Sequence, residues 1–159
     1  MKKFLSLILA ISFMLALTAC KNEAQEQLVV YSFYGENDCF KISNGTIVLS
    51  DSEDIFYGGS LHVTEPESII DISSYKATFY TVTDGQREII LVDELHNSSS
   101  AELLEVSLGK IVANDSELNQ QFKNIEQLNG KVFCELETTD KEGNKNSYTI
   151  EMELTKITK

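Results

Sequence analysis

The sequence predicts an all-β fold, an antiparallel sandwich of two sheets that is immunoglobulin-like in outline, with a closed β-barrel as the alternative. Asn44–Gly45 and Asp84–Gly85 each separate runs rich in β-branched and aromatic residues, which is a strong hairpin signal. Val132, Cys134 and Leu136 share one face of an expected strand and Glu135 lies on the other, which is the alternation of a half-buried strand. Short strands joined by hairpins are typical of sandwiches and barrels.

The expected strands share a high content of Val, Ile, Thr, Tyr and Phe. Gly58–Gly59 lies inside one of them and predicts a bulge or a sharp bend. The polar segment 140–147 is expected to join the last two strands as a turn. The strands are expected over residues 28–34, 40–42, 46–49, 55–63, 75–83, 86–92, 103–108, 110–112, 132–136 and 148–154.

One short helix is expected near 115–129. Leu118, Phe122, Ile125 and Leu128 fall on one helical face, and Asn129–Gly130 supplies a stop signal. We interpret this helix as a connector whose apolar face packs on the core.

The N-terminus has the features of an export signal. Two lysines precede an apolar run over residues 4–17, and the run ends in Leu17–Cys20, a Leu-Thr-Ala-Cys sequence that resembles the lipobox of bacterial lipoproteins. The run is shorter than the roughly 20 residues of a transmembrane helix. We therefore expect a signal peptide over 1–19, a lipidated Cys20, a tether over 20–27 and one β-sandwich domain over 28–159. Two acyl chains on Cys20 would hold the protein at the extracytoplasmic face of the cell membrane.

The expected mature chain of 140 residues (159 − 19) is strongly acidic. It keeps 25 acidic residues and 11 basic residues (13 − 2), a net charge of −14. This charge argues against binding to nucleic acid and against electrostatic binding to anionic lipid. It is typical of a soluble extracytoplasmic surface, although affinity for cations or basic partners stays open.

Two cysteines remain once Cys20 is assigned to the lipid. Cys39 and Cys134 could form one disulfide in an exported domain, and a loop of that length would give about 4–5 kcal/mol in the chain-entropy model. The alternative is two free thiols that act as small apolar residues. Because Cys134 lies on the same alternating face as Val132 and Leu136, it is expected to be buried.

No catalytic or cofactor motif is present, and we expect no cofactor. The sequence lacks a Cys-x-x-Cys pair, a zinc-ligand spacing and a nucleophile elbow, and a triad from Asp93, His96 and Ser98 has no support beyond proximity. A calcium loop is the weak metal candidate, because its oxygen ligands have suitable spacing but its glycine and flanking strands do not fit an EF-hand. A plain turn is the alternative for these residues, which are Asp140, Glu142, Asn144 and Asn146.

Aromatic residues occur in adjacent pairs on the expected strands. Since neighbours on a strand point to opposite faces, one member of each pair should face outward. An outer row of Tyr and Phe could bind a glycan or a protein, whereas rings at the edge of the core are the plainer explanation. The residues concerned are Tyr31, Phe33, Tyr34, Phe56, Tyr57, Phe79 and Tyr80.

Several stretches, taken with the lipobox, resemble a group of small uncharacterised lipoproteins of Firmicutes: residues 35–45, Phe56–Gly59, Phe79–Gly85 and Leu108–Ile111. The resemblance covers about 30–159 and implies a surface-tethered β-rich domain, with no site or activity to transfer. It also implies that Cys39 and Cys134 replace aromatic residues that pack together, which favours a bridge.

These observations predict a membrane-anchored extracytoplasmic domain that binds or scaffolds without catalysis. A protein or a glycan is the expected partner. The alternatives are an accessory subunit of an envelope complex and an enzyme with an unrecognised site.

Overall fold

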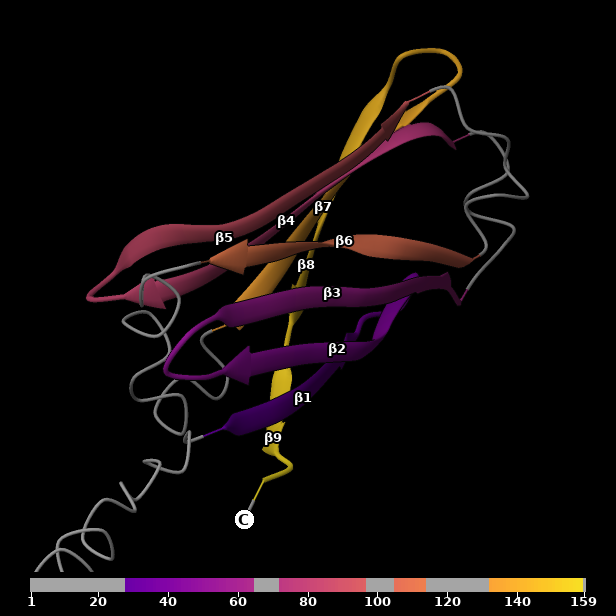
Figure 1. The fold of residues 1–159 in the computed structure, drawn as a ribbon. Coiled ribbons are helices and arrows are strands. Elements are labelled where there is room, and N and C mark those ends of the chain that lie inside the picture. The colour runs from indigo at the N-terminus through magenta and orange to yellow at the C-terminus, as the bar shows by residue number, and fades with distance from the viewer. Residues whose placement is uncertain (1–27, 65–71, 97–104, 114–131, 159) are drawn as a thin grey trace, which may run out of the picture.

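The computed structural model describes residues 28–64, 72–96, 105–113 and 132–158, which form two antiparallel sheets packed face to face (Figure 1). Sheet A has the strand order β6-β3-β2-β1-β9 and sheet B the order β5-β4-β7-β8. The strands are β1 (Val29–Glu36), β2 (Phe40–Leu49), β3 (Asp54–Val63), β4 (Ile72–Thr83), β5 (Gln86–His96), β6 (Glu105–Ala113), β7 (Val132–Asp140), β8 (Lys145–Glu151) and β9 (Glu153–Lys156).

The two-sheet sandwich is confirmed, and the two sheets do not close into the barrel that was the alternative. The expected helix near 115–129 lies outside the described residues. Within the described residues no helix is long and apolar enough to cross a membrane.

The hairpin expected at Asp84–Gly85 is confirmed, and it joins β4 to β5. Asp84 and Gly85 have φ angles of 51° and 78°, the left-handed pair that a two-residue hairpin turn needs. The bend expected at Gly58–Gly59 is also present, since Gly59 has a φ of 84° inside β3.

The prediction of a hairpin at Asn44–Gly45 is wrong. β2 runs through both residues and pairs with β1 and β3 on either side of them. Asn44 does take a left-handed φ of 59°, but Gly45 then lies under the ring of Phe33 on the neighbouring strand. The pair therefore kinks a strand instead of reversing it.

The reversal between β1 and β2 is made a few residues earlier, by Asn37. Its side-chain oxygen accepts the backbone N–H groups of Cys39 and Phe40 at 3.0 and 2.8 Å, and its own N–H donates to the carbonyl of Phe40. A short polar side chain thus satisfies the turn backbone that the sheet leaves unpaired.

Two further boundaries differ from expectation. Residues 103–108 and 110–112 were expected as two strands, but β6 continues through Gly109. Residues 148–154 were expected as one strand, but the chain leaves sheet B after Glu151 and enters sheet A at Glu153. The fully buried Met152 sits at this crossing and fills the core at the corner.

Three phenylalanine rings form the centre of the core between the sheets. Phe33 and Phe56 stack at 5.2 Å between ring centroids, and Phe79 of sheet B meets both rings edge-on at 6.0 and 5.2 Å. All three are at most 2% exposed. Such buried aromatic contacts dominate core energetics and join sheet A to sheet B.

Candidate functional site

The outer face of sheet B carries an aromatic pair crossed by a cation. Tyr80 of β4 lies opposite Phe133 of β7, and their rings stack with centroids 5.5 Å apart and planes 23° apart. The guanidinium carbon of Arg87 lies 3.8 Å from the centroid of the Tyr80 ring. Both aromatic residues face outward because their strand neighbours, Phe79 and Cys134, face the core.

An ion pair fixes Arg87 in this position. Its Nη1 lies 2.6 Å from Oε2 of Glu135, and Glu135 also accepts the hydroxyl of Ser147 at 3.2 Å. The hydrogen bond from Arg87 is the main reason that the pKa of Glu135 lies below its usual range. Partial burial, opposed by the charge of Arg87, raises the pKa of Tyr80.

Two large aliphatic side chains of the edge strand β5 extend this cluster. Ile89 lies opposite Tyr80 and is 59% exposed, and Val92 lies opposite Thr78 and is 45% exposed. Ile90 is the extra residue of a bulge between them, and it is buried. We call the group the sheet B patch, and its members are Tyr80, Arg87, Ile89, Val92, Phe133 and Glu135.

The sheet B patch is suited to contact with a partner surface. It combines Tyr, Phe and Arg, which are enriched in protein interfaces, with exposed aliphatic side chains. It holds no cysteine or histidine, and its one carboxylate is bound to its one guanidinium. Among the described residues no group of three His, Cys, Asp or Glu side chains could hold a metal ion.

The aromatic residues alternate as the sequence predicted, but they do not form one outer row. Phe33, Phe56 and Phe79 face inward while their neighbours face outward. Of the outward members, Tyr34 and Tyr57 lie on sheet A and only Tyr80 lies on sheet B. Phe133 was not among the expected aromatic residues, because neither of its chain neighbours, Val132 and Cys134, is aromatic.

Tyr34 and Tyr57 each have a polar partner on a neighbouring strand. The hydroxyl of Tyr34 bonds to the carboxylate of Glu153, which is the main cause that raises the pKa of Tyr34. The hydroxyl of Tyr57 lies 3.1 Å from that of Ser107. These two residues are therefore separate parts of a polar surface.

The structure holds Cys39 and Cys134 as free thiols, so the bridge that the sequence allowed is not formed in it. Cys134 is fully buried, as expected, and burial raises the pKa of its thiol to about 12. Cys39 is half-buried in the turn before β2, where its carbonyl accepts the N–H of Thr64.

The weak calcium candidate is a turn held together by its first carboxylate. Oδ1 of Asp140 accepts the N–H groups of Glu142 and Asn144, and Oδ2 accepts the side-chain amide of Asn144 at 2.8 Å. Gly143 completes the turn with a φ of 90°. The carboxylate oxygens thus point back at the turn, which matches the plainer alternative for Asp140, Glu142, Asn144 and Asn146.

Among the residues that the structure describes, the histidines do not assemble a triad. His96 pairs with Glu94 at 3.8 Å, and Asp93 accepts the hydroxyl of the buried Tyr75 at 2.8 Å, while Ser98 lies outside the described residues. His62 instead lies 3.0 Å from the hydroxyl of Ser43, on the outer face of sheet A.

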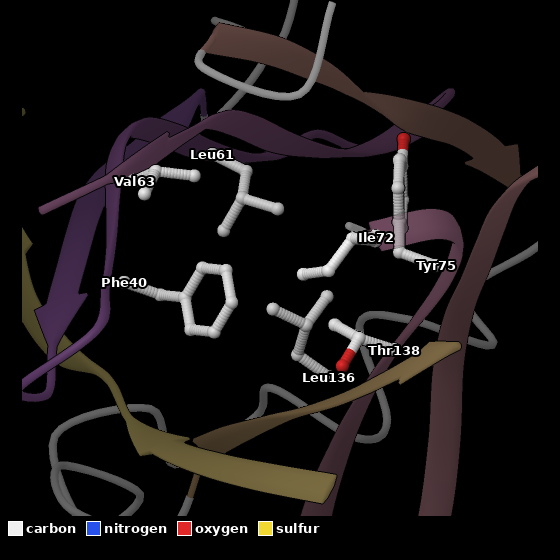
Figure 2. Close-up of a pocket in the computed structure, with 7 residues that line it drawn as sticks. All are labelled: Phe40, Leu61, Val63, Ile72, Tyr75, Leu136 and Thr138. Atoms are coloured by element: carbon white, nitrogen blue, oxygen red, sulfur yellow. The ribbon is translucent and has the colours of Figure 1, made fainter. Parts of the chain in front are cut away.

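A small cavity lies between the two sheets (Figure 2), and seven side chains converge on it. Its volume is about 10 Å³, which is near the limit for a single water molecule, and its lining is mostly aliphatic and aromatic. This space is therefore a packing gap and not a ligand site. The lining residues are Phe40, Leu61, Val63, Ile72, Tyr75, Leu136 and Thr138.

Comparison with known proteins found no matching family model, no matching curated protein and no matching solved structure. Cys20, the expected lipidation site, lies outside the described residues.

Proposed function

We propose that the protein is a lipid-anchored extracytoplasmic binding domain that docks a protein partner through the sheet B patch. The lipobox-like sequence ending at Cys20 supports the anchor. The observation that carries the binding role is Arg87 fixed over the stacked Tyr80 and Phe133, with Ile89 left exposed beside them.

The geometry favours a protein over a glycan. A sugar ring needs a free aromatic face, but Arg87 covers one face of Tyr80 and Phe133 stacks against the same ring. Exposed aliphatic side chains such as Ile89 and Val92 gain most from a water-excluding protein surface. Because the chain is strongly acidic, a partner with a neutral or basic rim fits best.

Site-specific photo-crosslinking in intact cells tests the docking role. A photoreactive amino acid replaces Ile89 in one strain and Glu105, an exposed residue on the other sheet, in a matched control. We expect one defined protein adduct at position 89 and none at position 105. Adding Arg87→Ala should weaken that adduct several-fold while the protein stays folded.

Equal adducts at both positions, or an adduct that Arg87→Ala leaves unchanged, would contradict docking through the patch. Retention of the purified protein on envelope polysaccharide, with no protein adduct, would indicate the glycan class instead. The anchor is tested separately with Cys20→Ser, which should release the protein or leave it unprocessed. If that variant is still cut at the same point and stays lipid-bound, the anchor assignment fails.

A further inference from the structure

Five apolar residues lie side by side across the outer face of sheet A. Four come from β1, β2, β3 and β6, and the fifth lies just beyond β9. Val30 of β1 lies opposite Val48 of β2, Val48 opposite Ile55 of β3, and Ile55 opposite Val112 of β6. On the other side of β1, Ile157 donates its N–H to the carbonyl of Val30 at 2.8 Å, just beyond β9. We call these five residues the aliphatic row.

The row is exposed at both ends. Val112 is 41% exposed and Ile157 is 60% exposed, while the three residues between them are half-buried. The neighbouring level of the same face is mostly polar, with Ser32, Thr46, Tyr57 and Lys110 at matching register positions. The row is therefore a narrow apolar band on an otherwise polar surface.

The row lies at the end of the sandwich where β1 begins. Leu28, the first described residue, is 53% exposed and directly precedes β1, whose second residue, Val30, belongs to the row. Only the seven residues 21–27 separate Leu28 from Cys20. Even when fully extended, a chain of that length spans at most about 29 Å, so an anchored Cys20 keeps the row close to the bilayer.

We propose that the aliphatic row rests on the lipid surface and orients the domain, so that the sheet B patch faces away from the membrane. This inference relies on the lipid anchor proposed above. The tether supplies a high effective concentration of membrane, so a weak apolar contact is enough to set the orientation. Isolated aliphatic side chains suit the interfacial region of a neutral bilayer.

A second copy of the chain is a poorer occupant of the row, because two strongly acidic domains repel each other. Anionic headgroups are also disfavoured, since Asp51 and Glu53 are exposed in the turn that leads to Ile55. The inference therefore commits to the neutral lipid surface.

The chain contains no tryptophan, which allows a direct test. The lipidated mature protein is reconstituted in phosphatidylcholine vesicles whose acyl chains are brominated, with single substitutions Val112→Trp or Ile157→Trp. Glu105→Trp, at the far end of β6, and Ile89→Trp, on sheet B, are the matched controls. Bromine quenches only tryptophan that reaches the acyl region.

We expect several-fold stronger quenching at positions 112 and 157 than at positions 105 and 89. Adding Val112→Ser to Ile157→Trp should reduce the quenching. Both residues are exposed, so the double substitution leaves the core intact. Equal quenching at all four positions, or none, would overturn the inference. A spectral shift that depends on protein concentration and not on lipid would overturn it in favour of a second copy.

Flotation of the same vesicles separates the two proposals. If the unsubstituted protein floats with the vesicles but positions 112 and 157 are not quenched, the anchor stands and the orientation fails. If the protein does not float, the anchor fails and this inference fails with it.

Discussion

Gly45 lies directly opposite Phe33 across the β1–β2 pair, and the ring of Phe33 fills the space where a Cβ on Gly45 would stand. A similar arrangement occurs in β3, where a Cβ on Gly58 would lie 2.9 Å from the ring of Phe79. Rings laid over glycines let sheet A bend around the aromatic core. The kinks in sheet A and the packing of the core are therefore one feature.

Gly45→Ala should destabilise the protein by about 1–3 kcal/mol or more, because the added methyl group collides with a ring that has no free space to move into. Phe33→Leu in the same background should recover part of that loss, so the double variant should fall short of the sum of the single effects. Urea denaturation of the four proteins measures the coupling. If the two effects on the free energy of unfolding were strictly additive, contact with the Phe33 ring would not be the cause of the loss in Gly45→Ala.

The sequence predicted the elements whose signal is local. The alternation at 132–136 and the Asp84–Gly85 turn depend on neighbouring residues, and both were found. The Asn44–Gly45 turn failed because the deciding contact comes from Phe33 on another strand. The turn preference of Asn-Gly depends only on neighbouring residues, so it gives no information about a ring that packs on Gly45 from another strand.

The sheet B patch could not be predicted from the sequence for a related reason. Tyr80 was recognised as one member of an aromatic pair, but its pairing with Phe133 depends on the register between β4 and β7. The position of Arg87 depends on the register between β4 and β5, including the bulge at Ile90. The pairing of β4 with β7, which are distant along the chain, and the bulge in β5 together set this site. Sequence periodicity predicts which face a side chain lies on, but it does not predict which residue of a distant strand lies opposite.

Cys134 should resist thiol reagents in the folded protein, because its side chain is fully buried and its pKa is raised to about 12. Cys39 is half-buried and should react first. Alkylation followed by peptide mass spectrometry measures both rates. In protein unfolded without reductant both residues should be labelled, and protection of both there would reveal a disulfide.

Asp140 should titrate below the ordinary range of aspartate, because the Asn144 side-chain amide and the backbone N–H groups of the turn stabilise its charged form. A pKa lowered by folding means that the contribution to stability is present above the unfolded value, about 3.9, and is lost as the pH falls through the folded value. Carbon-detected NMR titration of the carboxyl measures this. Asn144→Ala should move the midpoint upward, and an unchanged midpoint would refute the assigned cause.

Calcium should leave the thermal unfolding midpoint unchanged, and so should its removal with a chelator. Binding would require Asp140 to give up three hydrogen bonds that hold its own turn. Scanning calorimetry at matched ionic strength is the measurement. A saturable rise in the midpoint with calcium, abolished by Asp140→Asn, would restore the calcium loop.

Thr81→Val should stabilise the protein by about 1 kcal/mol, which is the low end of the cost of a buried polar group without a partner. Thr81 is fully buried in β4, and in the part of the chain that the structure describes its hydroxyl has no hydrogen-bond partner. Valine has nearly the same shape, so the exchange removes the desolvation cost and keeps the packing. Thr83→Val, at the exposed end of the same strand, is the matched control and should change stability very little. A loss of stability in Thr81→Val alone, measured by urea denaturation, would mean that the hydroxyl is satisfied in solution.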